Sequence, residues 1–443
     1  MRRLIRSILR VILRVFFPRI EIAGLGRVPQ HGPVILAGNH PNGLVDPVFL
    51  LCLSPRPVSF LAKAPLFEMP VIGWFVKALG SIPVYRRQDG GFDPSKNRKT
   101  FDRARSILSG GGVIAIFPEG ASHGDPKLRP LKTGAARIAL GASSMSESEK
   151  SLSIVPVGIY YTAKGIFRSS ALLYFGESIN VAREELNAES EPAAESVRAL
   201  TARIEQALAD VTLQADEHEA LSLVARAEGV FSSDDPSAEE RLVDRFELRR
   251  RFMAGYATLR TNAPERLAAI TAKIDRYEAE LREAGLDPET LQPTTAPHTP
   301  YTAILRAIAS LVVILPLALI GTVINYPVYR LVGAITARLS RNDNDIVATI
   351  KIIAGALLFP VSWILLAAAI GIYFGWTPGV FALVAAPLTG YLALLFFERL
   401  DRSIPGARAI LMSRFSRWGF LKLVAERRAI HEEIVELAAE FER

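Results

Sequence analysis

The chain has 443 residues, enough for two or three domains of roughly 100–200 residues each. Half of the residues are hydrophobic, 22% are charged and the mean hydropathy is +0.23, which excludes an intrinsically disordered chain. A single cysteine, Cys52, excludes a disulfide scaffold, an iron–sulfur centre and a cysteine-rich zinc site. The six histidines form no H-E-x-x-H or H-x3-H pair, which argues against a metalloprotease, and we expect no metal site.

The net charge of +7 is unevenly distributed. Residues 183–289 contain 14 basic and 24 acidic residues, whereas the rest of the chain contains 38 basic and 21 acidic residues. The basic residues accompany the hydrophobic stretches, which favours an anionic membrane surface as a partner. The sequence has no zinc-finger spacing or RNA-binding signature, so we expect no nucleic-acid partner.

Residues 1–24 predict a basic amphipathic helix that lies in the membrane interface. Its arginines fall within an arc of about 120° at helical pitch, and most of its apolar side chains lie on the opposite side. These arginines are Arg2, Arg3, Arg6, Arg10 and Arg14. The alternative is a helix that docks on the protein's own core and leaves its arginines in solvent.

Residues 25–215 alternate short apolar runs with helical patterns. The runs that predict strands are 34–37, 58–62, 81–84, 112–117, 154–161 and 171–176. The predicted helices lie near 46–52, 71–79, 99–108 and 133–140, and at 192–213. Nearly continuous apolar strands between helices are typical of an α/β fold, so we expect a mixed, mostly buried sheet with flanking helices.

Residues 216–300 form an acidic region with two amphipathic patterns, at 246–260 and 264–285. The second pattern ends at Gly285, as is usual for a helix C-terminus. We expect a plain helical hairpin here; a partner-docking element is the alternative.

Residues 301–400 form the predicted membrane region. The segments 352–374 and 378–397 each have about the 20 residues that cross a hydrocarbon core. Arginines follow this pair, which predicts that both of its ends face the cytoplasm; the alternative is a buried soluble hairpin. The earlier segment 307–324 contains Pro316 and has arginines on both sides, so a single crossing and a re-entrant hairpin both stay open. Residues 401–443 predict a basic amphipathic tail of the interfacial kind.

The most informative stretch is GNHPNGLVDP, residues 38–47, which joins a predicted strand to a predicted helix. His40 and Asp46 form a possible base and orienting acid across this turn, in which the carboxylate would hold the imidazole tautomer. Ligands bind at such sheet edges in α/β folds.

Two further runs end strands with clustered cations. GSIPVYR, residues 80–86, ends on Arg86, and the passage that begins with FPEGASH, residues 117–123, continues into basic positions. These positions are Lys127, Arg129, Lys132 and Arg137. A His-Asp pair beside cations suits a hydroxyl nucleophile on a phosphate-bearing substrate; for the cations alone, a solvated rim is the alternative.

Four runs in this order resemble the four sequence blocks of the phospholipid/glycerol acyltransferase family. They are NHPNGLVDP, GSIPVYR, FPEGASH and IVPVGI, and the resemblance covers residues 25–215. Five residues separate His40 from Asp46, whereas the usual family block has four. This form resembles the branch of glycerol-3-phosphate and dihydroxyacetone-phosphate acyltransferases, which implies a glycerolipid acyltransferase-like fold followed by a helical insert and C-terminal transmembrane helices.

The resemblance also implies roles for single residues. His40 would be the general base on the acceptor hydroxyl, with Asp46 orienting it, and Arg86 would bind the acceptor phosphate. The residues that would shape the acceptor site and line its pocket are Glu119, Gly120 and Pro156. Lys132 is expected as an additional phosphate ligand from its charge alone. The hydroxyl would attack the acyl thioester directly, so no metal, redox or other cofactor is expected.

The sequence therefore predicts a membrane-bound O-acyltransferase of phospholipid biosynthesis, with its catalytic domain in the cytoplasm. The expected donor is acyl-CoA or acyl-carrier protein, and the expected acceptor is glycerol 3-phosphate or dihydroxyacetone phosphate. One alternative is the same chemistry on a lysophospholipid, chiefly 1-acylglycerol 3-phosphate. Another is a non-catalytic lipid-binding membrane protein.

Overall fold

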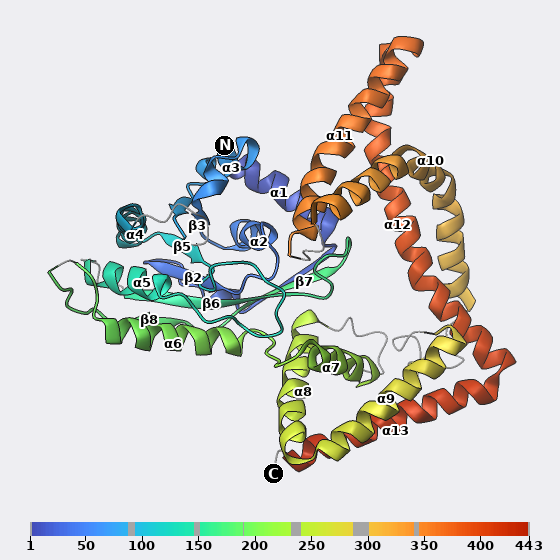
Figure 1. The fold of residues 1–443 in the computed structure, drawn as a ribbon. Coiled ribbons are helices and arrows are strands. Elements are labelled where there is room, and N and C mark those ends of the chain that lie inside the picture. The colour runs from blue at the N-terminus through green and yellow to red at the C-terminus, as the bar shows by residue number, and fades with distance from the viewer. Residues whose placement is uncertain are drawn as a thin grey trace. The chain divides into compact units, whose positions relative to one another are not determined.

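The computed structural model describes residues 2–86, 94–145, 151–188, 190–231, 241–286, 301–340 and 345–441 (Figure 1). The chain divides into two compact units. The first comprises Met1–Gln214 and Ser340–Ile352, and the second comprises Ala215–Leu339 and Ile353–Arg443. The sequence pattern assigns residues 340–352 to the membrane region, whereas here they belong to the unit that contains the predicted catalytic residues.

The first unit is built on an eight-stranded sheet in the order β1-β7-β6-β2-β5-β3-β4, with β8 paired to β6. The strands are β1 (Arg19–Ala23), β2 (Val34–Gly38), β3 (Val58–Lys63), β4 (Ile82–Val84), β5 (Val113–Ile116), β6 (Leu152–Tyr161), β7 (Ser170–Phe175) and β8 (Ile179–Val181). Strand β6 pairs antiparallel with β7 and β8, and the other pairs are parallel. The six predicted strands are confirmed; β1 and β8 are short and partly polar, so no apolar run marks them.

Helices cover both faces of this sheet (Figure 1). They are α1 (Arg2–Phe16), α2 (Val45–Leu53), α3 (Pro70–Ala78), α4 (Pro94–Ser109), α5 (Gly134–Met145) and α6 (Ala194–Asp210), with short 3-10 turns at Leu25–Arg27 and Ala64–Phe67. Alternate residues of β2 enter opposite cores: Leu36 packs with α1 and α2, and Ile35 packs with α4, α5 and α6. The predicted mixed, mostly buried sheet with flanking helices is confirmed.

Helix α1 packs with one of its sides against the rest of the first unit. Leu13 and Phe16 are buried in the core, and the Arg10 guanidinium donates from Nε and Nη2 to the carbonyl oxygen of Cys52 at 3.0 and 2.8 Å. Arg6 reaches the next turn of chain, donating to the carbonyl oxygen of Ser54 at 3.2 Å. These carbonyls end α2, where cations are favourable because the helix dipole is negative there. The alternative prediction, a helix docked on the protein's own core, is therefore confirmed for this side of α1. Arg6 and Arg10, however, bind carbonyl oxygens instead of lying in solvent.

The second unit contains a helical core made of α7 (His218–Phe231), α8 (Leu242–Asn262), α9 (Pro264–Ala284) and α13 (Arg417–Phe441). The predicted helix end at Gly285 is confirmed, because this residue adopts the left-handed conformation (φ 66°) and caps α9. Helix α13 buries Phe420, Leu423 and Ile430 in the same core. The amphipathic tail of residues 401–443 was expected to lie on lipid; its apolar side instead packs on protein from Phe420 onward.

Among the described residues, three helices are long and apolar enough to cross a membrane, and most of their length belongs to the second unit. They are α10 (Tyr301–Ser340), α11 (Val347–Phe374) and α12 (Trp376–Phe415). Helix α10 is one continuous helix with Pro316 and Pro327 inside it, and it bends along its length (Figure 1). For this segment the single crossing and the kinked re-entrant hairpin both remain predictions.

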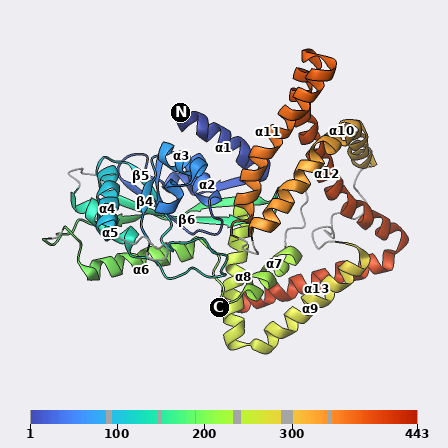
Figure 2. The ribbon, with the colours of Figure 1, turned by 45° about the horizontal axis from the view of Figure 1, so that its top comes forward.

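The predicted pair of spans forms a tight helical hairpin. Helices α11 and α12 are joined at Gly375 (φ +96°) and lie side by side next to it (Figure 2). A Cβ atom at Gly379 would lie only 2.8 Å from the Ala367 carbonyl oxygen and 3.0 Å from the Gly371 Cα. Close approach at small residues is typical of helix packing inside membranes.

Candidate active site

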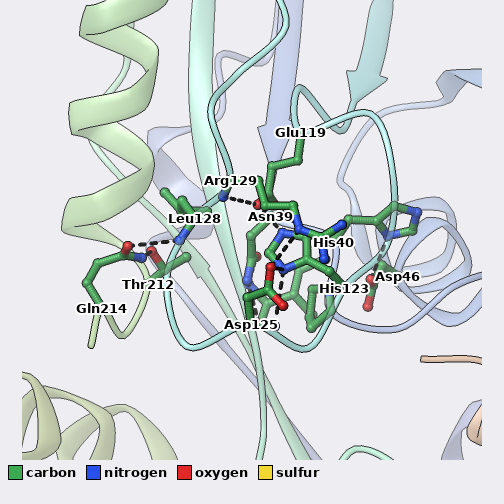
Figure 3. Close-up of polar contacts among 12 residues, drawn as sticks. Asn39, His40, Asp46, Glu119, His123, Asp125, Leu128, Arg129, Thr212 and Gln214 are labelled. Atoms are coloured by element: carbon green, nitrogen blue, oxygen red, sulfur yellow. Dashed lines mark hydrogen bonds and ion pairs between the residues drawn. The ribbon is translucent and has the colours of Figure 1, made fainter. Parts of the chain in front are cut away.

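Three of the predicted motifs meet at one edge of the sheet. Strands β2, β5, β3 and β4 are parallel neighbours, so their carboxyl ends face the same way. His40 follows β2, Glu119 follows β5 and Arg86 follows β4. Figure 3 shows His40, Asp46 and Glu119 close together at this edge. The sheet order therefore collects residues that are up to 79 positions apart in the chain.

The His40 imidazole and the Asp46 carboxylate form a hydrogen bond. Nδ1 of His40 lies 2.8 Å from Oδ2 of Asp46, so the ring donates through Nδ1 and keeps Nε2 for a substrate. The His40 side chain is 16% exposed, whereas the Asp46 carboxylate is fully buried. This is the geometry of an oriented general base.

The five-residue spacing between the two residues is accommodated by a turn at the start of α2. The carbonyl oxygen of Asn42 accepts from the amides of Val45 at 2.9 Å and Asp46 at 3.3 Å, and Gly43 has a positive φ of 31°. Asp46 thereby lies in the first turn of α2, where a carboxylate is stabilised by the helix dipole.

Asp46 has two further partners. The backbone amide of Asn42 donates to Oδ2 at 2.7 Å, and the Tyr161 hydroxyl donates to Oδ1 at 2.6 Å. Burial and the adjacent Asp46 carboxylate raise the pKa of Tyr161 well above its ordinary value, so its hydroxyl keeps the proton that it donates. Tyr161 was predicted only as a strand residue, because nothing local to the IVPVGIYY run indicates its partner.

A side chain extends the sheet to support this loop. The Asn39 amide group accepts from the Ile159 amide at 2.7 Å and donates to the Ile159 carbonyl at 3.2 Å. The Asn39 side chain thereby extends the hydrogen bonding between β2 and β6 by one residue beyond Gly38. His40 follows directly, so its backbone is tied to the long strand that also carries Tyr161.

Glu119 binds the backbone of His40 from the neighbouring strand end. Its Oε1 accepts from the His40 amide at 3.2 Å, and its Oε2 accepts from the Arg129 amide at 2.9 Å and from Nε2 of His123. The His123 amide in turn donates to the His40 carbonyl at 3.1 Å. Phe117 adds a stacked ring 4.2 Å from the His40 ring, centroid to centroid. Both sides of the His40 peptide are thus held by the FPEGASH run.

The sequence did not assign a role to His123. Its Nδ1 accepts from the Asp125 amide at 3.2 Å, which leaves Nε2 as the nitrogen that carries hydrogen toward Glu119. The side chain is 7% exposed, so it supports Glu119 from inside the loop.

Two of the predicted cations lie against the turn at Gly120. This residue has a positive φ of 79°, and its carbonyl oxygen accepts a hydrogen bond from the Arg86 guanidinium. A Cβ atom at Gly120 would lie 3.4 Å from Cγ of Lys132, so the lysine stem passes beside it. Arg129 instead pairs with Asp125 at 2.6 Å. Arg86 and Lys132 are therefore brought together next to Glu119.

Pro156 lies inside β6, opposite Ala37 of β2. Its carbonyl oxygen accepts from the Gly176 amide at 2.9 Å, and its ring lies beside Gly176. These contacts belong to the sheet and its connection to β8, so a place for Pro156 in the pocket stays a prediction. Within the described part of the chain, no group of three or more His, Cys, Asp or Glu side chains is arranged to hold a metal ion.

The chain matches two family models. Residues 19–160 match the model described as Acyltransferase, and residues 235–442 match the model described as Glycerol-3-phosphate acyltransferase 2 C-terminal domain. The first match contains His40, Asp46, Arg86, Glu119 and Lys132 and ends one residue before Tyr161, and the second contains α8 to α13.

Curated relatives match the chain over very different lengths. Glycerol-3-phosphate O-acyltransferase 1 of Saccharomyces cerevisiae is 26% identical, and the match covers 97% of this chain and 70% of that protein. Glycerol-3-phosphate O-acyltransferase 2 of the same yeast is also 26% identical, with 60% of this chain and 37% of that protein covered. A chloroplastic 1-acyl-sn-glycerol-3-phosphate acyltransferase of Brassica napus is 29% identical over 33% of this chain and 39% of that protein.

Proposed function

We infer that this chain, which belongs to the phospholipid/glycerol acyltransferase family, transfers a fatty acyl group from a thioester donor to glycerol 3-phosphate in glycerolipid synthesis. The observation that carries this proposal is the 2.8 Å bond between His40 and buried Asp46, at a sheet edge that also carries Arg86 and Lys132. The extent of the matches supports the acceptor. Relatives named for glycerol 3-phosphate match far beyond the catalytic unit, whereas the plant 1-acylglycerol-3-phosphate enzyme matches a third of the chain.

In the proposed reaction, Nε2 of His40 removes the proton from an acceptor hydroxyl as its oxygen attacks the thioester carbonyl carbon. Asp46 holds the ring in the tautomer that leaves Nε2 unprotonated, and it stabilises the imidazolium that forms. The tetrahedral intermediate then collapses, the carbon–sulfur bond breaks, and His40 returns the proton to the leaving thiolate. The products are an ester and a free thiol, with no covalent enzyme intermediate and no cofactor.

We propose that Arg86 and Lys132 bind the acceptor phosphate. A guanidinium pairs with two phosphate oxygens at once, and the Lys132 ammonium adds a second charge beside the Gly120 turn. Both oxygens of Glu119 accept hydrogen bonds from the protein, so we propose that Glu119 and Gly120 shape the acceptor site by fixing its loops. Pro156 would line the pocket from β6.

We further propose that the protein spans the membrane through the hairpin of α11 and α12, whose two ends lie on the same side of the membrane as the catalytic unit. Large apolar side chains on these helices are exposed to the surroundings, among them Leu365 (65%), Ile372 (81%) and Phe381 (73%), as a helix in lipid requires. The arginines that follow the apolar part of α12, from Arg399 onward, favour a cytoplasmic catalytic unit.

Helix α1 gives the catalytic unit its own contact with anionic lipid in this proposal. Leu4, Ile8, Val11 and Val15 recur at helical spacing and are all exposed, away from the side that docks on the core. The exposed Arg14 on the same helix would bind lipid phosphates.

The acceptor is tested with purified full-length protein and a radiolabelled acyl donor, supplied as acyl-CoA or as acyl-carrier protein. Glycerol 3-phosphate, dihydroxyacetone phosphate and 1-acylglycerol 3-phosphate are compared at matched concentrations. We expect transfer to glycerol 3-phosphate with the highest kcat/KM. Transfer only to 1-acylglycerol 3-phosphate would replace the proposed acceptor, and no transfer to any acceptor would favour a lipid-binding role.

Membrane attachment is tested by extraction. A protein with a membrane-spanning hairpin resists both about 1 M salt and carbonate and is released by detergent, since spanning segments hold a protein effectively irreversibly. Release by carbonate would show that the apolar helices do not span.

A further inference from the structure

A short segment far along the chain lies against the His40–Asp46 loop. Residues 345–352, which include the first turns of α11, belong to the first unit. Ala348 is fully buried and Ile352 packs against the core that contains α1 and α2. The chain then continues from this segment into the membrane-spanning part of α11. The segment is therefore part of the catalytic unit, although some 300 residues separate it from the loop.

The first contact of this segment with the loop is a hydrogen bond at the start of α2. The backbone amide of Leu44 donates to Oγ1 of Thr349 at 3.2 Å. Leu44 is the N-cap residue of α2, and Asp46 lies in the first turn of the same helix. The Thr349 hydroxyl thereby satisfies one of the amides that a helix leaves unpaired at its N-terminus.

The second contact is an ion pair that bridges two loops. Nζ of Lys164 pairs with Oδ1 of Asp345 and also donates to the carbonyl oxygen of Pro41 at 3.2 Å. The carbonyl oxygen of Lys164 accepts from the side-chain amide of Asn42 at 3.1 Å. Lys164 and Asp345 are only 24% and 18% exposed, so water screens this pair less than a surface pair. Lys164 thus holds the two residues that follow His40.

The fit around these contacts is close. A Cβ atom at Gly43 would lie 3.0 Å from Oγ1 of Thr349 and 3.1 Å from the carbonyl oxygen of Asp345. A Cβ atom at Gly124, next to His123, would lie 2.6 Å from Nζ of Lys164 and 3.2 Å from Oδ1 of Asp345. The segment therefore reaches both loops that hold His40, and either loop would have to shift if a larger residue replaced its glycine.

We propose that residues 345–352 are a positioning segment of the active site. Thr349 and the Asp345–Lys164 pair hold Pro41–Leu44, and so keep His40 aligned with Asp46. This inference rests on the proposed acyltransferase function. It adds positioning residues that lie outside all four sequence motifs, and it makes the first turns of a membrane helix a requirement for fast turnover.

The test uses full-length protein in lipid nanodiscs and three variants. Thr349→Val removes the hydroxyl and keeps the shape of the side chain, whereas Thr349→Ser keeps the hydroxyl and removes only the methyl group. Thr201→Val is the matched control. The Thr201 hydroxyl bonds to the Val197 carbonyl within α6 at 2.7 Å, and so it has no role in the loop. We measure kcat, the KM values of both substrates, and hydrogen exchange of peptides that contain residues 41–44.

A misplaced catalytic group costs up to about 100-fold in rate, so Thr349→Val should lower kcat about 10- to 100-fold while both KM values stay within about twofold. Exchange at residues 41–44 should rise about 2- to 10-fold, the effect of one lost hydrogen bond. Thr349→Ser should recover most of the kcat, and Thr201→Val should match the wild type in every measurement.

Two results would overturn the inference separately from the function. An active wild type with an unchanged kcat in Thr349→Val would refute the positioning role alone. An equal loss of kcat in Thr349→Ser and Thr349→Val would show that the hydroxyl is not what positions the loop. An inactive wild type would instead refute the proposed function, and this inference would fall with it.

Discussion

Replacing Asp46 with asparagine separates the charge of this residue from its shape. The structure lets asparagine keep the local bonding: its side-chain oxygen can accept from Nδ1 of His40 and from the Asn42 amide, as Oδ2 does now. Its NH₂ group would then face the Tyr161 hydroxyl, which can rotate to accept. The variant should therefore fold and lose only the negative charge beside the imidazole.

The expected loss of rate follows from that charge. A unit charge pair about 4 Å apart interacts by about 4 kcal/mol at an effective dielectric of about 20, which is a factor of about 10³ in rate. The His40 ring is 16% exposed, so solvent screens part of this interaction. Asp46→Asn should accordingly lower kcat about 10²- to 10³-fold, because the imidazolium formed on proton transfer is no longer stabilised.

The assay follows acyl transfer to glycerol 3-phosphate under saturation by both substrates, with circular dichroism as the check on folding. The KM values should change little, since Asp46 is buried behind His40 and touches no substrate in the proposed reaction. A folded Asp46→Asn protein with kcat within a few-fold of the wild type would refute the role given to the carboxylate.

Three further predictions concern neighbouring groups. Arg86→Ala should raise the KM of glycerol 3-phosphate at least tenfold and the KM of the acyl donor much less. Arg86→Lys should restore little of the lost affinity for glycerol 3-phosphate, because a lysine is not bidentate. Equal effects on both KM values in steady-state kinetics would assign Arg86 to structure. Tyr161→Phe removes one hydrogen bond to a charged group, about 1.5–3 kcal/mol, from Asp46 but leaves its charge. It should therefore lower kcat less than Asp46→Asn does while lowering the midpoint of thermal unfolding; a larger kcat loss than in Asp46→Asn would contradict this. Burial raises the pKa of the Cys52 thiol to about 11, although the nearby arginines act in the opposite direction. The reactive thiolate is therefore scarce below about pH 9 in the folded protein. Mass spectrometry after iodoacetamide treatment at pH 7.5 should show labelling of Cys52 only once the protein is unfolded; rapid labelling of the native protein would be the opposite result.

The fold could be predicted from the sequence where patterns are local. The buried runs around Ile35, Ile114 and Val155 are almost wholly apolar because both faces of the sheet are covered, and this identifies them as strands. The joining of His40 and Asp46 was also predictable, since both lie in one turn. Arg86 and Glu119 were predictable because parallel strands end at the same edge.

Other features depend on contacts that no local pattern records. Tyr161 reaches Asp46 across 115 positions, and Thr349 reaches Leu44 across 305. An amphipathic pattern gives a helix its apolar side but does not say what covers that side. For this reason α13 was expected on lipid and packs on α9 instead, and Arg6 and Arg10 of α1 bind the end of α2.

The most direct test of the central claim is the turnover of glycerol 3-phosphate by His40→Ala, compared with His31→Ala as an exposed-histidine control. Formation of the acyl ester and release of the free thiol are measured together, on folded full-length protein at saturating donor and acceptor. A positioned general base contributes about 10²- to 10⁴-fold, so His40→Ala should lose turnover by that factor while His31→Ala keeps it. Turnover by His40→Ala within a few-fold of the wild type would contradict the claim that His40 is the base.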